Sequence, residues 1–194
     1  IDGTDGSGKG TQTELLLKYL DSNNIRNKYI DFPRYYTSFH GQMVGRYLAG
    51  EFGSLESSSP YLTSLFYAMD RLTARDEIVD WLEDGNTVVA NRYTTSSMAF
   101  QTARIKKDKR DEFIKWLYDM EYKEHKLPKE DLVLFLYVPV EISQKLIDQK
   151  ASRDYVAGKK KDINEANVAY QKEVLSLYLE LAKKNKHWEV IKCV

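Results

Sequence analysis

The segment at residues 3–11 reads Gly-Thr-Asp-Gly-Ser-Gly-Lys-Gly-Thr, and it constrains the fold of this chain more than any other. Its glycines leave backbone N–H groups free to converge on an anion, and the helix predicted to start near Lys9 adds its positive end. Lys9 itself brings a full charge to the β and γ phosphates. We therefore expect a nucleoside triphosphate to bind at the following residues: Gly3, Thr4, Asp5, Gly6, Ser7, Gly8, Lys9, Gly10 and Thr11.

The order of predicted elements places this loop in an α/β fold. The strand-like runs are 28–32, 87–91, 132–138 and 188–194, and the segments of helical period are 11–23, 62–83, 111–124 and 166–181. Strands separated by helices predict a parallel sheet, of about five strands, covered by helices on both faces. We expect one domain over residues 1–194, with a mobile lid in the polar stretch at about 149–164.

Charge and cysteine content exclude several kinds of protein. Lys plus Arg number 29 and Asp plus Glu also number 29, so the chain lacks the positive surplus of a general nucleic-acid binder. The longest apolar run, 132–138, is too short to cross a membrane. Cys193 is the single cysteine, so these residues form no disulfide among themselves and give no sign of an oxidising compartment. We expect a cytoplasmic protein that binds neither nucleic acid nor membranes.

One position departs from the general phosphate-binding motif. Gly10 stands where Ser or Thr normally offers a hydroxyl to Mg²⁺, and Thr11 comes one residue late. The motif alone does not separate a kinase from a switch or a motor. A GTP-reading switch would need Asn-Lys-x-Asp, and the nearest approach, at residues 27–31, is one residue too long and lies too early. We therefore set the switch aside.

Further segments follow in the order typical of one family. They are Phe32-Pro33-Arg34-Tyr35, Leu-Phe-Tyr-Ala-Met-Asp-Arg at 65–71, Asn91-Arg92-Tyr93 with 96–100, and Leu-Pro-Lys-Glu-Asp-Leu at 127–132. Together with the phosphate loop they resemble thymidylate kinase over nearly the whole chain. The resemblance implies a P-loop nucleoside monophosphate kinase fold with an acceptor-binding region at about 31–100. It also implies direct in-line transfer of the γ-phosphoryl group of ATP to dTMP, giving dTDP, with Mg²⁺ accompanying ATP.

The resemblance assigns acceptor contacts residue by residue. Arg34 and Arg92 follow predicted strands, where open α/β sheets bind ligands, and their guanidinium forks suit the acceptor phosphate. Tyr67 and Arg71 are four residues apart and share a helix face, so the ring is expected to stack on the base and the arginine to read it. The full acceptor set is Asp5, Phe32, Pro33, Arg34, Tyr35, Tyr67, Arg71, Arg92, Ser96, Ser97 and Phe100.

Three of these residues bear on substrate preference. Guanidinium only donates hydrogen bonds, so Arg71 fits thymine O4 and disfavours the amino group of cytosine. Ser97 occupies the position that approaches N3 and O4 in relatives. Phe100 matches the aromatic residue under the sugar, and its ring offers a ribose 2′-hydroxyl no partner. The thymine methyl is worth only about 1–3 kcal/mol in a pocket, so selectivity against dUMP stays open.

Phosphoryl transfer requires cations around the transferred group. The loop at 4–7 contains no arginine, so the chain resembles those thymidylate kinases whose lid carries the basic residue, with Arg153 the best candidate. We expect Lys9, Arg92 and Arg153 to be catalytic. No direct metal ligand is assigned, and Asp5 and Asn91 are candidates through water. Asn91 departs from the family, which usually has an acid before this arginine.

The sequence leaves alternatives open for the assembly of the protein and for its function. The resemblance implies a homodimer formed by helices near the acceptor site, for which Met43, Val44, Tyr47 and Leu48 offer an apolar face that the sequence does not separate from core. A kinase for another monophosphate, such as dUMP, AMP or a modified deoxynucleotide, would carry the same phosphate loop. A nucleotide-binding regulatory protein without transfer is suggested by the departures at positions 10 and 91.

Overall fold

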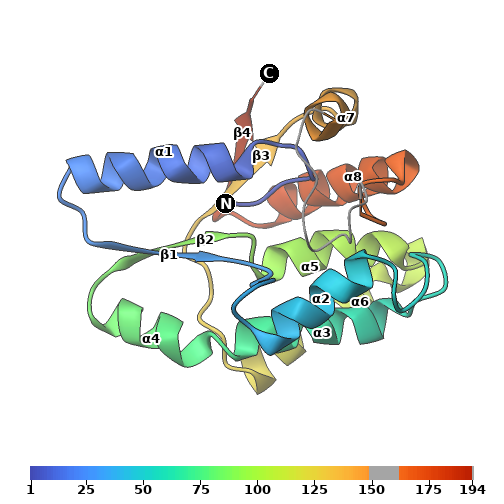
Figure 1. The fold of residues 1–194 in the computed structure, drawn as a ribbon, viewed down its shortest axis with the longest axis horizontal. Coiled ribbons are helices and arrows are strands. Elements are labelled where there is room, and N and C mark those ends of the chain that lie inside the picture. Colours follow the sequence, from blue (N-terminus) through green and yellow to red (C-terminus); the bar gives the residue numbers. More distant parts are fainter. Residues whose placement is uncertain (149–161, 194) are drawn as a thin grey trace.

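The computed structural model describes residues 1–148 and 162–193, in which helices alternate with short strands (Figure 1). The α-helices are α1 (Lys9–Ser22), α2 (Phe39–Leu48), α3 (Pro60–Leu72), α4 (Arg75–Glu83), α5 (Thr94–Phe100), α6 (Arg110–Tyr118), α7 (Val140–Asp148) and α8 (Val168–Lys184). The strands are β1 (Asn27–Asp31), β2 (Thr87–Asn91), β3 (Val133–Tyr137) and β4 (Trp188–Lys192). Shorter helical segments are η1 (Thr102–Arg104), η2 (Lys107–Lys109) and the π-helical η3 (Asp119–Glu124).

The four strands form two parallel pairs. β1 pairs with β2 and β3 pairs with β4. The first two residues lie between the pairs: the amide of Arg92 donates to the carbonyl of Ile1 at 2.9 Å, and the amide of Leu136 donates to the carbonyl of Asp2 at 2.9 Å. The parallel direction agrees with the sequence prediction, whereas one continuous sheet of about five strands stays a prediction.

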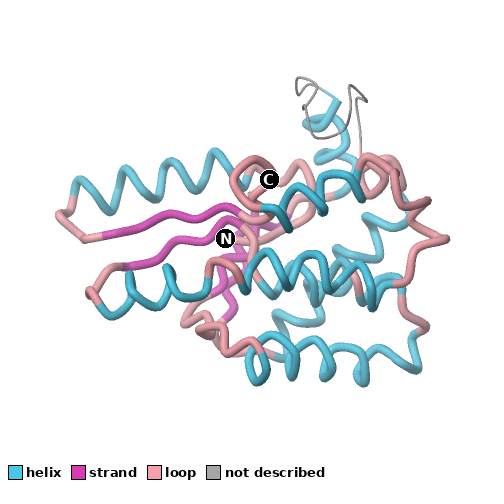
Figure 2. Tube along the Cα trace, turned by 60° about the horizontal axis from the view of Figure 1, so that its bottom comes forward, coloured by secondary structure: helices cyan, strands magenta, loops and turns pink. Residues whose placement is uncertain are grey.

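Helices lie on both sides of the β1–β2 pair. In Figure 1, α1 lies above this pair and α4 lies below it. Figure 2, a view from a second direction, shows the strands in magenta close to one another. The helix α1 begins after Gly8, whose left-handed backbone, at φ 84°, is favourable for glycine and costly for other residues. Within the described part of the chain, none of the helices has the length and apolar character that crossing a bilayer requires.

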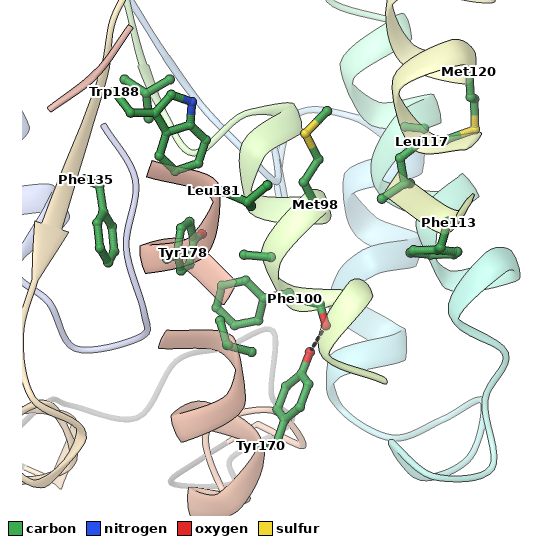
Figure 3. Close-up of a cluster of buried hydrophobic side chains, with 14 of the residues drawn as sticks. Met98, Phe100, Phe113, Leu117, Met120, Phe135, Tyr170, Tyr178, Leu181 and Trp188 are labelled. Atoms are coloured by element: carbon green, nitrogen blue, oxygen red, sulfur yellow. Dashed lines mark hydrogen bonds between the residues drawn. The ribbon is translucent and has the colours of Figure 1, made fainter. Parts of the chain in front are cut away.

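The largest buried cluster lies between α5, α6, α8 and the β3–β4 pair (Figure 3). Phe135 of β3 stacks on Tyr178 of α8, with ring centroids 4.9 Å apart. The hydroxyl of Tyr170, also on α8, donates to the backbone carbonyl of Phe100 at 2.6 Å. This packing fixes the end of α5 against α8, and it thereby holds the Phe100 ring in place.

The helix predicted over 62–83 is interrupted, so that part of the sequence prediction is wrong. A break at Thr73 separates α3 from α4. The carbonyl of Asp70, which a continuous helix would offer to Ala74, instead accepts from the Arg34 guanidinium at 2.8 Å and from the Thr73 hydroxyl at 2.9 Å. A partner distant in sequence therefore ends the helix.

The structure also shows the surroundings of two apolar faces. Val44, Tyr47 and Leu48 of α2, considered for a dimer interface, are buried within the chain itself. Leu62 and Leu65 of α3, which belong to the segment of helical period at 62–83, are exposed. The side of α3 that faces the rest of the chain is largely polar, since its buried residues are Thr63, Ser64, Ala68, Asp70 and Arg71.

Candidate active site

A cavity of about 400 Å³ opens where the phosphate loop meets the carboxyl ends of β1 and β2. Residues that the sequence assigns to nucleotide or metal binding form most of its wall: Asp5, Gly6, Ser7, Gly8, Lys9, Gly10, Phe32, Pro33, Tyr35, Tyr67, Arg71, Asn91, Arg92, Ser96, Ser97 and Phe100. The structure therefore brings the phosphate loop and the predicted acceptor region together around one hollow.

Several assigned residues lie elsewhere. Gly3 and Thr4 are buried and do not line the cavity, and Thr11 is exposed on α1. Arg34 is not among the residues that line this cavity. Arg153 and the predicted lid as far as residue 161 lie outside the described residues.

Lys9 is turned back onto the phosphate loop. Its ammonium Nζ donates to the carbonyl of Thr4 at 2.8 Å and to that of Gly3 at 3.2 Å. Gly6 permits the tight path of the loop, because its φ is 76° and a Cβ there would lie 2.4 Å from the carbonyl oxygen of Ser143. The loop thus holds a cation at the cavity wall, where phosphate oxygens can replace these carbonyls as its acceptors.

Arg92 follows β2 in a left-handed backbone conformation, with φ 63°, which is uncommon outside glycine. Its guanidinium donates to Asp5 Oδ1 at 2.5 Å and to Ser96 Oγ at 3.2 Å, and it lies 4.9 Å from the centre of the Phe100 ring. Burial lowers the pKa of Arg92, but Asp5, Tyr178, Asp2 and Tyr35 together raise it by more, so the pKa is raised overall. The guanidinium is therefore charged at any ordinary pH.

Asp5 is held from two sides. Besides its contact with Arg92, it accepts from Gln171 Nε2 at 3.0 Å, and Gln171 also donates to the carbonyl of Asn164 at 3.0 Å. These bonds tie α8 and the segment before it to the phosphate loop. Asp162 and Glu165 of that segment line the cavity but were not assigned from the sequence. Acidic residues at the end of the predicted lid were the signal that could have identified them.

The wall of the cavity also contains Arg71 and Tyr67, the residues that are expected to contact the base. The Nη2 of Arg71 donates to Ser97 Oγ at 2.8 Å, and its Nε donates to Glu121 Oε2 at 3.1 Å. Burial lowers the pKa of Arg71, but the charge and hydrogen bonds of Glu121, together with Tyr93 and Asp70, raise it by more, so the guanidinium stays charged. Glu121, in η3, was not identified from the sequence, because it shares no motif with the arginine that it binds.

Ser96 lines the cavity and also helps to hold neighbouring elements of the fold in position. Its hydroxyl donates to Asp2 Oδ1 at 2.7 Å. The Asp2 carboxylate is buried and accepts further hydrogen bonds from Thr95 Oγ1 at 2.5 Å and from the Tyr178 hydroxyl at 2.5 Å. Asp2 therefore fixes the start of α5 and the middle of α8 behind the phosphate loop.

Arg34 is held against α3. Its Nη2 donates to Thr73 Oγ1 at 2.5 Å and to the carbonyl of Asp70 at 2.8 Å, and its backbone amide donates to Asp70 Oδ2 at 2.8 Å. The structure therefore does not bring its guanidinium to the phosphate loop, although the neighbouring residues Phe32, Pro33 and Tyr35 line the cavity.

The polar residues of the cavity fit a hydrated divalent cation. Oδ1 of Asn91 is buried and has no hydrogen-bond partner among the described residues, so it can accept a hydrogen bond from a metal-bound water. Asp5 and Asp31 provide carboxylates in the same wall. In residues 1–148 and 162–193, no three His, Cys, Asp or Glu side chains form a metal-binding group. Phosphate oxygens and water would therefore supply most ligands, as is usual for Mg²⁺ with nucleotides.

Comparisons with known proteins identify the family of the chain. A family model described as thymidylate kinase matches residues 1–193. The thymidylate kinase of Mycobacterium tuberculosis is 30% identical over 182 residues, which cover 94% of this chain and 84% of that protein. The thymidylate kinase of Plasmodium falciparum is 32% identical over 148 residues, covering 76% of this chain and 64% of that protein.

The fold is also shared with a solved thymidylate kinase. The structure of the enzyme from Candida albicans, described as having broad substrate specificity, matches with a TM-score of 0.74 and 25% sequence identity. The match covers 99% of this chain and 81% of that one. Because the sequence match spans nearly the whole chain and the backbone follows that of a solved member, the chain belongs to the thymidylate kinase family and has its P-loop nucleoside monophosphate kinase fold.

Proposed function

We propose that this chain transfers the γ-phosphoryl group of ATP to dTMP, so that dTDP and ADP are the products. The observation that carries the proposal is one cavity whose wall contains both the phosphate loop and the residues Tyr67 and Arg71. In-line transfer requires the donor and acceptor phosphates to meet end to end, and such a cavity allows it. Membership of the thymidylate kinase family supports the same reaction.

Two cations of the cavity would neutralise the meeting phosphates. Lys9 lies in the loop that binds the phosphates of ATP, and Arg92 follows β2 on the acceptor side. The phosphate groups repel each other, so fixed positive charges lower the barrier mainly by electrostatic stabilisation. No general base is assigned, because the attacking oxygen of dTMP is already anionic.

The base end of the cavity suits thymine. Arg71 presents only hydrogen-bond donors, which fit the O4 acceptor of thymine and oppose the amino group of cytosine. Glu121 and Ser97 hold this guanidinium in one orientation. Phe100 is 7% exposed and packs on Tyr170, so the wall near the proposed sugar position is apolar and favours a deoxyribose.

The proposed chemistry includes groups that lie at or beyond the edge of the described residues. Mg²⁺ is the proposed metal, with ATP phosphates and water as its main ligands, and with Asp5 and Asn91 acting through water. Arg153 is the proposed third catalytic cation, in a lid at about 149–164 that lies mostly outside the described residues. Arg34 is proposed as a second phosphate contact, which requires its guanidinium to leave Asp70.

The proposed assembly is a homodimer in the cytoplasm. The exposed face of α3, which contains Leu62 and Leu65, is the proposed contact, since apolar side chains on one helix face are normally covered. The strands are proposed to act as one sheet of about five, with residues 1–2 as its middle strand. The cytoplasmic location rests on Cys193 being the single cysteine.

A panel of monophosphates tests the proposed reaction. ADP release is measured with ATP and, in turn, dTMP, dUMP, dCMP, TMP with ribose, and AMP. We expect kcat/KM to be highest for dTMP, about 10⁴-fold lower for dCMP and about 10–200-fold lower for dUMP. Faster turnover of another monophosphate would make the chain a kinase for that nucleotide. ATP binding without ADP release for any acceptor would identify a regulatory nucleotide-binding protein.

A further inference from the structure

Asp31 and Asn91 are direct neighbours at the carboxyl ends of β1 and β2. They are register partners in the parallel pair, so their side chains lie on the same face. Both residues line the cavity, which also contains Lys9 and Arg92. Asp31 was not assigned from the sequence, because nothing in its local segment indicates which residue of another strand it faces.

The amide of Asn91 is used on one side only. The amide opposes the rise in the pKa of Asp31 and of Tyr29, which lies two residues earlier on the same face of β1, as a nearby hydrogen-bond donor does. A carboxylate only accepts hydrogen bonds, so the NH₂ group of Asn91 must face Asp31. This leaves Oδ1 of Asn91 as the buried atom without a partner among the described residues. A donor from outside the protein, such as a metal-bound water, would satisfy it.

The charge around Asp31 favours a role in binding. The surrounding protein displaces hydration from the carboxyl and raises its pKa, whereas Arg92 and Lys9 oppose that rise. The side chain nevertheless remains accessible to solvent. Asp31 is thus a carboxylate beside two cations, with room for a hydrated ion next to it.

We propose that Asp31 supplies the carboxylate, and Asn91 the amide oxygen, that bind the water shell of the divalent cation accompanying ATP. The carboxylate that organises the metal would then lie on β1. Asn91, which stands where the family usually has an acid, would contribute only a hydrogen bond to the metal-bound water. The inference rests on the proposed function, because it assumes that ATP binds in the phosphate loop. Mg²⁺ typically keeps several waters and uses one or two carboxylates in addition to phosphates, which matches one acid and one amide at this edge.

An exchange of the two side chains tests the proposal. The variants are Asp31→Asn, which removes the carboxylate, and Asp31→Asn combined with Asn91→Asp, which returns it on the other strand. Affinity for a non-hydrolysable ATP analogue is measured by calorimetry, without acceptor, once with Mg²⁺ and once with EDTA. The metal ratio is the dissociation constant in EDTA divided by the dissociation constant in Mg²⁺. It gives the contribution of the metal to ATP binding separately from turnover.

We expect Asp31→Asn to reduce this ratio about 10–100-fold, with affinity in EDTA unchanged or higher, and the exchanged double variant to restore most of it. Asp108→Asn, at an exposed position in η2, removes the same charge and should keep the wild-type ratio. Thermal unfolding of each variant checks that the fold is intact.

Other outcomes would overturn the inference. They are a ratio within about twofold of wild type in Asp31→Asn, an equal loss of affinity with and without metal, or no recovery in the double variant. The test also separates this inference from the proposed reaction. Absence of dTMP phosphorylation by the wild-type protein would count against the reaction, but the metal ratio would still be measured.

Discussion

The Nε of Arg71 donates a hydrogen bond to Oε2 of Glu121 at 3.1 Å, and Nη2 of the same guanidinium donates to Oε1. Both side chains are almost fully buried, at 2% and 1% exposed. The pair joins α3 to η3 and fixes the plane of the guanidinium at the cavity. An arginine held in this way has its donors arranged before a base arrives, so little conformational freedom is lost on binding.

Glu121→Gln is expected to raise KM for dTMP at least about tenfold, because loss of one charge-assisted hydrogen bond, worth about 1.5–3 kcal/mol, loosens Arg71. KM for ATP should change little, since Glu121 lies at the base end. Breaking a buried ion pair should also lower the free energy of unfolding by about 3–5 kcal/mol. Steady-state kinetics and urea unfolding measure the two effects.

Glu124→Gln is the matched control, because Glu124 is an exposed glutamate of the same π-helical segment. It should retain wild-type kinetics and stability. An unchanged KM for dTMP in folded Glu121→Gln would show that the ion pair stabilises the protein without positioning Arg71 for the substrate.

The sequence identified residues that line the site better than the residues that hold them in position. Arg71 and Ser97 belong to short motifs with local spacing, and both line the cavity. Glu121 lies 50 residues from Arg71 along the chain, and residue patterns do not show which distant acid a buried arginine will meet. The same limit explains Asp31, whose neighbour Asn91 is set by strand register.

The prediction of secondary structure failed where tertiary contacts decide. The helix α5 begins Thr-Thr-Ser-Ser and has no apolar period, yet all of it is buried because its hydroxyls find acceptors such as Asp2. The helices α2 and α7 were likewise not predicted as separate elements. The boundary between α3 and α4 depends on Arg34, which lies 36 residues before Asp70. The helices α1 and α8 were predicted correctly within a few residues.

Arg92→Ala is expected to lower kcat at least about 100-fold and to raise KM for dTMP, because it removes a fixed charge from beside the dTMP phosphate, whose oxygen attacks the transferred group. ATP affinity should change little, since the phosphate loop and Lys9 are intact. Arg92→Lys should recover part of the activity, because lysine keeps the charge but loses the fork that holds phosphate at two points. Initial rates and calorimetry with ATP measure these effects. Wild-type kinetics with dTMP in Arg92→Ala would contradict the assigned site.

Gly41→Ala is expected to lower the free energy of unfolding by about 1–3 kcal/mol, because an added Cβ overpacks the contact between α2 and the segment after β1. That Cβ would lie 2.2 Å from the carbonyl oxygen of Arg34. The carbonyl has little room to move, since the amide of Arg34 is bound to Asp70 at 2.8 Å. Gly10→Ala is the control, with open space around the added atom and a gain in helix propensity. Equal stability of Gly41→Ala and wild type in urea would contradict the close approach.

Replacement of both members of the buried ion pair, Arg71→Met with Glu121→Leu, separates stability from base recognition. Apolar residues of similar size often replace a buried ion pair without loss, or with a gain of about 1–4 kcal/mol, because neither charge must be desolvated. We therefore expect this double variant to unfold at a higher urea concentration than Glu121→Gln. Recognition should not recover, since no guanidinium remains to favour thymine O4 over the amino group of cytosine. The preference for dTMP over dCMP in kcat/KM should fall from about 10⁴-fold to less than about tenfold, measured by ADP release. If a stable double variant kept the full preference, Arg71 would not be the residue that reads the base, and Ser97 would become the first candidate for that role.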